Sequence, residues 1–187
     1  MINEWIEENK GEFISAGMSR RVFEWTPDPT LVLKHAHDRW VDANQGEARV
    51  WEQAPELLRR ALAPVTWVSP CGSYLLMKKA KTLTKMKYLE LARSLVHTRN
   101  LEGVFLPPAL SWDLHRGNWG VIEGKPVLID YTPFTSEKVV PEDLRVERLW
   151  SYDVLEKFQN RVRWELGERQ LQMSLKLDME VKYIPEY

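Results

Sequence analysis

Residues 111–134 read SWDLHRGNWGVIEGKPVLIDYTPF, and this stretch decides how the whole chain is interpreted. It holds an aspartate, Asp113, then Asn118 five positions later, and a second aspartate, Asp130, at the end of an apolar run. Residues 119–129 alternate strand-forming residues around the turn sequence Glu-Gly-Lys, which predicts a β-hairpin. The hairpin would fold Asp130 back towards Asn118, so residues separated in the sequence would converge in space.

The three polar side chains of this stretch are the types that phosphoryl transfer requires. An aspartate can accept the proton of an attacking hydroxyl, which is the role that we assign to Asp113. Mg²⁺ prefers hard oxygen ligands, and we expect Asn118 and Asp130 to supply them. A polar turn that merely caps a hairpin is the simpler alternative for Asp113 and Asn118.

Upstream of this stretch, the chain is dominated by short strand-like runs around one helix. A single glycine, Gly17, marks a hairpin between the first two runs. Helical spacing of the apolar residues predicts a helix over 42–54, which would end just before a proline. The predicted strands are 13–16, 21–25, 31–36, 65–68 and 74–77.

A lysine and a glutamate stand out in this first half. The predicted strand 31–36 is apolar apart from Lys34 and His35, and a lone ammonium on so apolar a strand needs an anionic partner. Glu47 is followed at helical spacing by Val50, Trp51 and Ala54, which places its carboxylate on the apolar face of the helix. Two simpler interpretations remain open: Lys34 could be an edge-strand lysine that protects against aggregation, and Glu47 could be a first-turn acid that interacts with the helix dipole.

The second half reads as mainly helical apart from residues 111–134. Helical spacing runs from 86 to 99, and Pro141 opens a last helical region in which Trp150 and Phe158 share a face. We therefore divide the chain into residues 1–80 and 81–187, packed as one compact structural unit.

Composition excludes several classes of protein. The chain has 187 residues, 44% hydrophobic and 28% charged, with a net charge of −1 and one cysteine. A near-neutral chain gives no reason to expect binding to nucleic acid or to a membrane surface, and no internal disulfide can form. The N-terminal sequence has no apolar core of a signal peptide, so we expect a cytoplasmic protein.

Residues 113–118, DLHRGN, resemble the catalytic loop of the protein-kinase-like superfamily, and Ile129-Asp130-Tyr131 stands where that superfamily has its D-F-G segment. The histidine and glycine of the loop are similar to those of the aminoglycoside phosphotransferases. The loop most resembles the minimal kinase domain of the early serine/threonine kinases of T7-like bacteriophages.

The resemblance implies an α+β, two-lobed protein-kinase-like fold. Its N-lobe would be an antiparallel sheet of about five strands plus one helix, and its reduced C-lobe would be mostly helical. It implies ATP and Mg²⁺ as cofactors and a Lys34–Glu47 ion pair that orients the nucleotide phosphates. Gly17 would lie in the loop over the phosphates, while Val32 and Met77 would contact the nucleotide.

Several departures from the superfamily qualify this interpretation. The glycine-rich loop is reduced to Gly17, so we expect Arg20 or Arg21 to add positive charge near the phosphates. Tyr131 replaces the phenylalanine of the D-F-G segment.

The leading functional interpretation is a minimal phage-type protein kinase that phosphorylates serine or threonine of host proteins and of itself. The resemblance points to host transcription or RNA-processing proteins as partners, in the bacterial host cytoplasm. A small-molecule phosphotransferase acting on an aminoglycoside or choline, and a pseudokinase that acts by binding a host protein, are the alternatives.

Overall fold

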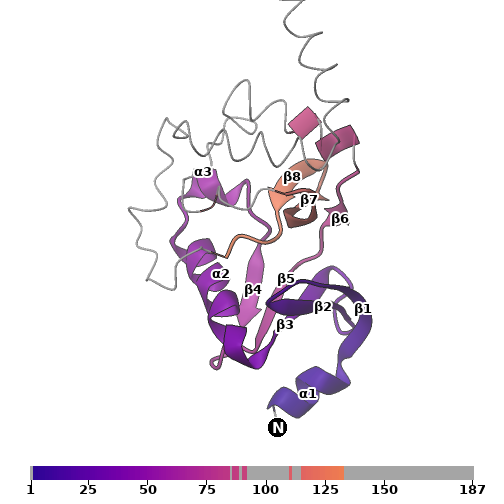
Figure 1. Ribbon diagram of the computed structural model, residues 1–187, viewed down its shortest axis with the longest axis vertical. Coiled ribbons are helices and arrows are strands. Elements are labelled where there is room, and N and C mark those ends of the chain that lie inside the picture. The colour runs from indigo at the N-terminus through magenta and orange to yellow at the C-terminus, as the bar shows by residue number, and fades with distance from the viewer. Residues whose placement is uncertain (1, 85, 89, 92–109, 111–114, 133–187) are drawn as a thin grey trace, which may run out of the picture.

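The computed structural model describes residues 2–84, 86–88, 90–91, 110 and 115–132. They form a mixed α/β arrangement in which helices flank two antiparallel sheets (Figure 1). The elements are α1 (Ile2–Glu8), β1 (Lys10–Ala16), β2 (Arg20–Trp25), β3 (Leu31–Ala36), the 3-10 helix η1 (Asp38–Trp40), α2 (Val41–Gln53), α3 (Glu56–Arg59), β4 (Val65–Val68), β5 (Tyr74–Lys78), β6 (Lys81–Thr82), the 3-10 helix η3 (Arg116–Asn118), β7 (Trp119–Ile122) and β8 (Lys125–Leu128).

The larger sheet has five strands in the order β1-β2-β3-β5-β4, and all its neighbouring strands are antiparallel. β3 lies at its centre, where Lys34 is opposite Val22 of β2 and Leu75 of β5. A central strand covered on both faces carries apolar residues on both, which explains the sequence LVLKHA of β3. Lys34 and His35 are the exceptions, and the rest of the fold has to satisfy the charge of the buried Lys34.

The two faces of this sheet have separate apolar clusters, because successive side chains of a strand point to opposite faces. On one face, Leu33 packs with Trp25 and Tyr74 and with Ile6 of α1. The other face is covered by α2, whose Val50 belongs to the larger cluster. Lys34 follows Leu33 and therefore points to the α2 face.

The smaller sheet has the order β6-β7-β8 and contains the hairpin predicted from the sequence. Ile122 pairs with Lys125, so the turn has two residues, Glu123 and Gly124. Both have positive φ angles, 51° and 83°. Such a turn matches the natural twist of the paired strands and favours glycine.

Backbone pairing joins the two sheets at residues 61–63. Leu62 forms a parallel bridge with Leu128 of β8. The amide of Ala63 donates to Leu128 O and the amide of Leu128 donates to Ala61 O, both at 2.8 Å. We call this backbone pairing of residues 61–63 with Leu128 the seam. Because of it, residues 129–132, which follow β8, lie at the buried face of α2.

The strands predicted at 31–36 and 65–68 are confirmed, and β2 and β5 differ from the prediction by one residue. β1 begins three residues earlier than predicted, at Lys10, because pairing with β2 extends the strand over residues 10–12, which have no apolar signal of their own. The predicted helix 42–54 corresponds to α2, which begins and ends one residue earlier, and residues 86–88 and 90–91 are helical as expected. The short elements α1, α3 and β6 had not been predicted.

The helical region expected from Pro141 onwards, with Trp150 and Phe158, lies outside the described residues. The division at residue 80 stays a prediction for the same reason. None of the helices in the described ranges is long and apolar enough to cross a membrane.

Candidate functional site

A buried ion pair between β3 and α2 forms the centre of the candidate site. Lys34 Nζ lies 2.7 Å from Glu47 Oε2, and the two residues are 5% and 0% exposed. The core-facing register deduced for Glu47 from the helical spacing is thus confirmed. Because a lone buried charge is strongly unfavourable, the pair forms where the central strand crosses beneath the helix.

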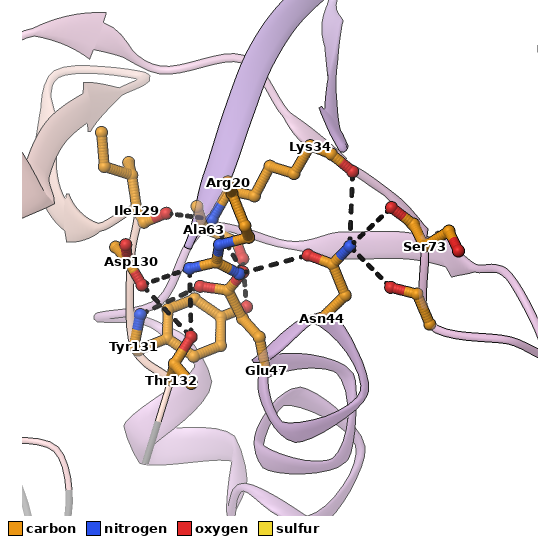
Figure 2. A network of polar contacts seen from close by, with 11 residues as sticks. Arg20, Lys34, Asn44, Glu47, Ala63, Ser73, Ile129, Asp130, Tyr131 and Thr132 are labelled. Atoms are coloured by element: carbon orange, nitrogen blue, oxygen red, sulfur yellow. Dashed lines mark hydrogen bonds and ion pairs between the residues drawn. The ribbon is translucent and has the colours of Figure 1, made fainter. Parts of the chain in front are cut away.

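A second cation, Arg20, reaches the same carboxylate from the first residue of β2. One of its terminal nitrogens donates to Glu47 Oε2 at 2.7 Å and to Asn44 Oδ1 at 3.3 Å. The other nitrogen forms an ion pair with Asp130 and donates to Thr132 Oγ1 at 3.0 Å. Arg20 is 4% exposed, and Figure 2 shows it between the helix and the segment after β8.

The segment after β8 is bonded to this pair through its backbone as well as its side chains. Lys34 Nζ donates to Ile129 O at 2.5 Å, and the amide of Tyr131 donates to Glu47 Oε1 at 2.9 Å. The Tyr131 hydroxyl donates to Ala63 O at 2.7 Å, beside the seam between the sheets. Asp130 is thereby held next to two buried cations.

The electrostatics of the site follow from burial and from these contacts. Burial alone would raise the pKa of Asp130, but the charges of Arg20 and Lys34 outweigh it and lower that pKa to about 2. Burial lowers the pKa of Lys34, with Glu47 acting in the opposite direction. Burial also opposes the charge of Arg20, but Glu47 and Asp130 raise its pKa above the ordinary value. Asp130 is therefore a carboxylate at neutral pH.

Asn44, one helical turn before Glu47, fixes Arg20 to the sheet. It is fully buried, and its Nδ2 donates to Gly72 O at 2.9 Å and Ser73 O at 3.2 Å (Figure 2). Its Oδ1 is left to accept from Arg20. The turn between β4 and β5 thus sets the position of the guanidinium.

The predicted loop is described from His115 onwards. His115 Nδ1 accepts from the amide of Gly117 at 3.0 Å, so this histidine braces the turn that leads to Asn118. Asn118 is 7% exposed, and its carbonyl accepts from the amide of Ile129 at 2.8 Å. The hairpin therefore brings Asn118 and the residue before Asp130 together, as the sequence predicts. Asp113 lies outside the described residues.

Of the residues expected around the nucleotide, Gly17 lies in the turn between β1 and β2, and Val32 and Met77 lie on the sheet. The amide of Gly17 donates to Arg20 O at 2.8 Å and closes the hairpin between β1 and β2. Val32 and Met77 are directly opposite each other on β3 and β5. Met77 is buried in the α2-side cluster, and Val32 packs against that cluster.

A cavity of about 600 Å³ lies on a different part of the sheet. Its lining includes Met18, Arg21, His35, Arg39 and Trp40, and none of the residues of the ion-pair network. Arg21 is exposed and follows the buried Arg20, as strand alternation requires. The network and the cavity are therefore separate features.

The charge and exposure of Asp130 suit a divalent metal ion. Asp130 is ionised, and its side chain remains 40% exposed, so a cation can approach it. Carboxylate and amide oxygens are hard ligands that suit Mg²⁺, and Asn118 is the second ligand predicted from the sequence. Clusters of three or more histidine, cysteine, aspartate or glutamate side chains, which would favour a transition metal, do not occur in the described part of the chain.

Sequence reasoning missed the roles of Arg20 and Asn44. Arg20 was expected near a phosphate, but the structure gives it two carboxylate partners. Because Arg20 and Arg21 are the same residue type, the sequence does not show which of the two strand positions is buried. For Asn44 the available signal was its position three residues before Glu47, on the same buried face of α2.

No protein-family model and no curated protein sequence matches this chain. Among solved structures, it is similar to the crystal structure of WbdD, with 16% identity and a TM-score of 0.45 over 82% of this chain. The chain spans 46% of the length of that protein. It is also similar to APH(2")-IIa in a ternary complex with streptomycin and ATP. There the identity is 12% and the TM-score 0.43, over 87% of this chain and 81% of the other.

Proposed function

We propose that this chain is an ATP-dependent phosphotransferase with a two-lobed protein-kinase-like fold. The observation that carries the proposal is the position of Lys34. Its ammonium is buried, paired with Glu47 and bonded to the backbone carbonyl that precedes Asp130. An ammonium held in this way, beside an ionised carboxylate, is the arrangement that positions a nucleotide phosphate next to a metal ligand.

Each residue has a role in this proposal. Lys34, oriented by Glu47, would contact the phosphates, and Asp113 would accept the proton of the attacking hydroxyl. Mg²⁺, when bound by Asn118 and Asp130, would neutralise the charge that develops on the transferred phosphoryl group. The hairpin at Gly17 would cover the phosphates, with Val32 and Met77 beneath the base.

The acceptor that we propose is a serine or threonine of a protein, as in phage-type kinases. This step rests on the loop sequence of residues 113–118. Host transcription or RNA-processing proteins, in the bacterial cytoplasm, are the proposed substrates together with the chain itself.

The test is transfer of labelled phosphate from ATP and Mg²⁺ to the purified protein and to bacterial lysate proteins. We expect label with the wild type and none with Asp113→Ala. Asp38→Ala, at an exposed aspartate of η1, serves as the control and should label like the wild type. Full labelling by Asp113→Ala would refute the proposed mechanism. Faster transfer to an aminoglycoside or choline than to any protein would replace the protein substrate by a small molecule.

Two observations favour a second candidate, a pseudokinase that binds a partner without transferring phosphate. Arg20 already neutralises Asp130, and the loop over the phosphates has only Gly17. This candidate predicts no label in any lane, no thermal shift with Mg-ATP, and stoichiometric capture of a single host protein.

A further inference from the structure

Four charged side chains form a balanced set in the candidate site. Arg20 and Lys34 carry two positive charges, and Glu47 and Asp130 carry two negative charges. Three of the four are almost completely buried, while Asp130 is 40% exposed on its side chain. The charges therefore cancel within the protein before any ligand arrives.

Arg20 is a fixed part of this set, because its two terminal nitrogens contact four different side chains. One nitrogen is shared by Asn44 and Glu47, and the other by Asp130 and Thr132 (Figure 2). A planar guanidinium can bridge two carboxylates in this way, whereas an ammonium acts as a point charge. Thr132 Oγ1 lies 3.3 Å from the same Asp130 oxygen, so that oxygen has two partners.

We propose that Arg20 is a built-in counter-cation for Asp130, with which a divalent metal ion has to compete. This inference rests on the proposed function, since it takes Asp130 as a metal ligand. It makes Arg20 a positioning residue: it fixes the carboxylate beside Glu47 and lowers its attraction for a free cation. A metal ion that binds together with a polyphosphate brings negative charge, which offsets the positive charges of Arg20 and Lys34. The site therefore favours the metal–polyphosphate complex over the metal ion alone.

The competition follows from simple electrostatics. Two cations near one carboxylate repel each other, and the repulsion is largest where water is largely excluded. Removing the charge of Arg20 should therefore strengthen the binding of metal alone. A residue with a merely structural role would weaken or abolish metal binding when replaced, so the sign of the change separates the two roles.

The test measures binding of Mn²⁺, used as a paramagnetic probe, to the folded protein by electron paramagnetic resonance. We expect Arg20→Gln to bind Mn²⁺ at least tenfold more tightly than the wild type. Arg20→Lys keeps the charge but cannot bridge both carboxylates, so we expect an intermediate affinity. Arg21→Gln removes an exposed arginine from the same strand and should leave the affinity unchanged.

Circular dichroism of each variant establishes whether it is folded. If Arg20→Gln does not fold, the Mn²⁺ affinity of Arg20→Lys alone tests the inference. Affinities that are equal to, or weaker than, that of the wild type in both Arg20 variants would overturn the inference. Introducing Asp130→Asn into the Arg20→Gln protein should abolish the gain. If no variant binds Mn²⁺ even with ATP present, the proposed metal site fails, which is a different outcome from equal binding by all.

Discussion

Arg20 and Lys34, on adjacent strands, converge on one oxygen atom. Each donates to Glu47 Oε2 at 2.7 Å. Arg20 is opposite Ala36 and Lys34 is opposite Val22, so both cations lie on the face of the sheet that α2 covers. Glu47 is the common anion of the site, and its loss affects more partners than the loss of Lys34.

Glu47→Gln should therefore destabilise the fold more than Lys34→Met. The glutamine would leave two buried cations with Asp130 as their remaining carboxylate, and removal of one partner of a buried pair costs about 3–5 kcal/mol. In Lys34→Met, Glu47 still accepts from Arg20 and from the amide of Tyr131. Urea unfolding of the two variants gives the comparison, and equal losses would contradict the central position of Glu47.

Asn44→Ala should lower the free energy of unfolding by about 1–3 kcal/mol, the usual cost of leaving buried hydrogen-bond partners unsatisfied. The variant would remove one acceptor of Arg20 and the donor to Gly72 O and Ser73 O. Its neighbour on α2, Gln45, makes an exposed hydrogen bond to Pro70 O, so Gln45→Ala is the matched control. Indistinguishable denaturation curves for the two variants would show that Asn44 does not anchor the network.

Alanine substitutions at two glycines with positive φ distinguish the cost of backbone strain from the cost of steric overlap. At Gly124, with φ of 83°, an added Cβ would meet no atom within 4 Å, so Gly124→Ala should cost only the about 1–2 kcal/mol of a left-handed residue. At Gly72, with φ of 77°, the Cβ would lie 2.5 Å from Val41 O. We expect thermal unfolding of Gly72→Ala at a clearly lower temperature. The reverse order would mean that the turn moves away from α2 freely.

Cys71 should react with iodoacetamide at an unusually low pH. Hydrogen bonds with Ser69 and Ser73 lower the pKa of its exposed thiol to about 7. The reactive thiolate fraction increases as the pH rises through the pKa, so the rate should be half-maximal near pH 7. Ser73→Ala should move the midpoint upwards. The chain unfolded in urea provides the control, since it has this one cysteine and should titrate near the ordinary value of about 8.5.

The sequence was sufficient for the parts of the fold that repeat a simple period. The alternation of apolar residues located β3, and helical spacing correctly placed Glu47 on the buried face of α2. The Glu-Gly turn located the hairpin that brings Asn118 beside Ile129. These patterns are local, so they can be read without knowledge of the tertiary contacts.

Contacts between distant segments could not be predicted in the same way. Arg20 begins a strand beside another arginine, and nothing local distinguishes the buried one from the exposed one. Its partner Asp130 is 110 residues away. The polar edge strand β1 was predicted too short because its start depends on pairing with Trp25 rather than on its own residues.

The seam at residues 61–63 also limits how the chain can be divided experimentally. Leu128 pairs with this segment, and Tyr131 and Asp130 complete the bonds of Glu47 and Arg20. A fragment that stops at residue 80 would contain Arg20, Lys34 and Glu47 but not Asp130. Two cations and one carboxylate would then leave an uncompensated positive charge at the buried site. The first five strands are therefore a poor choice for separate expression: any truncated version intended for crystallisation or NMR should retain the sequence through Thr132.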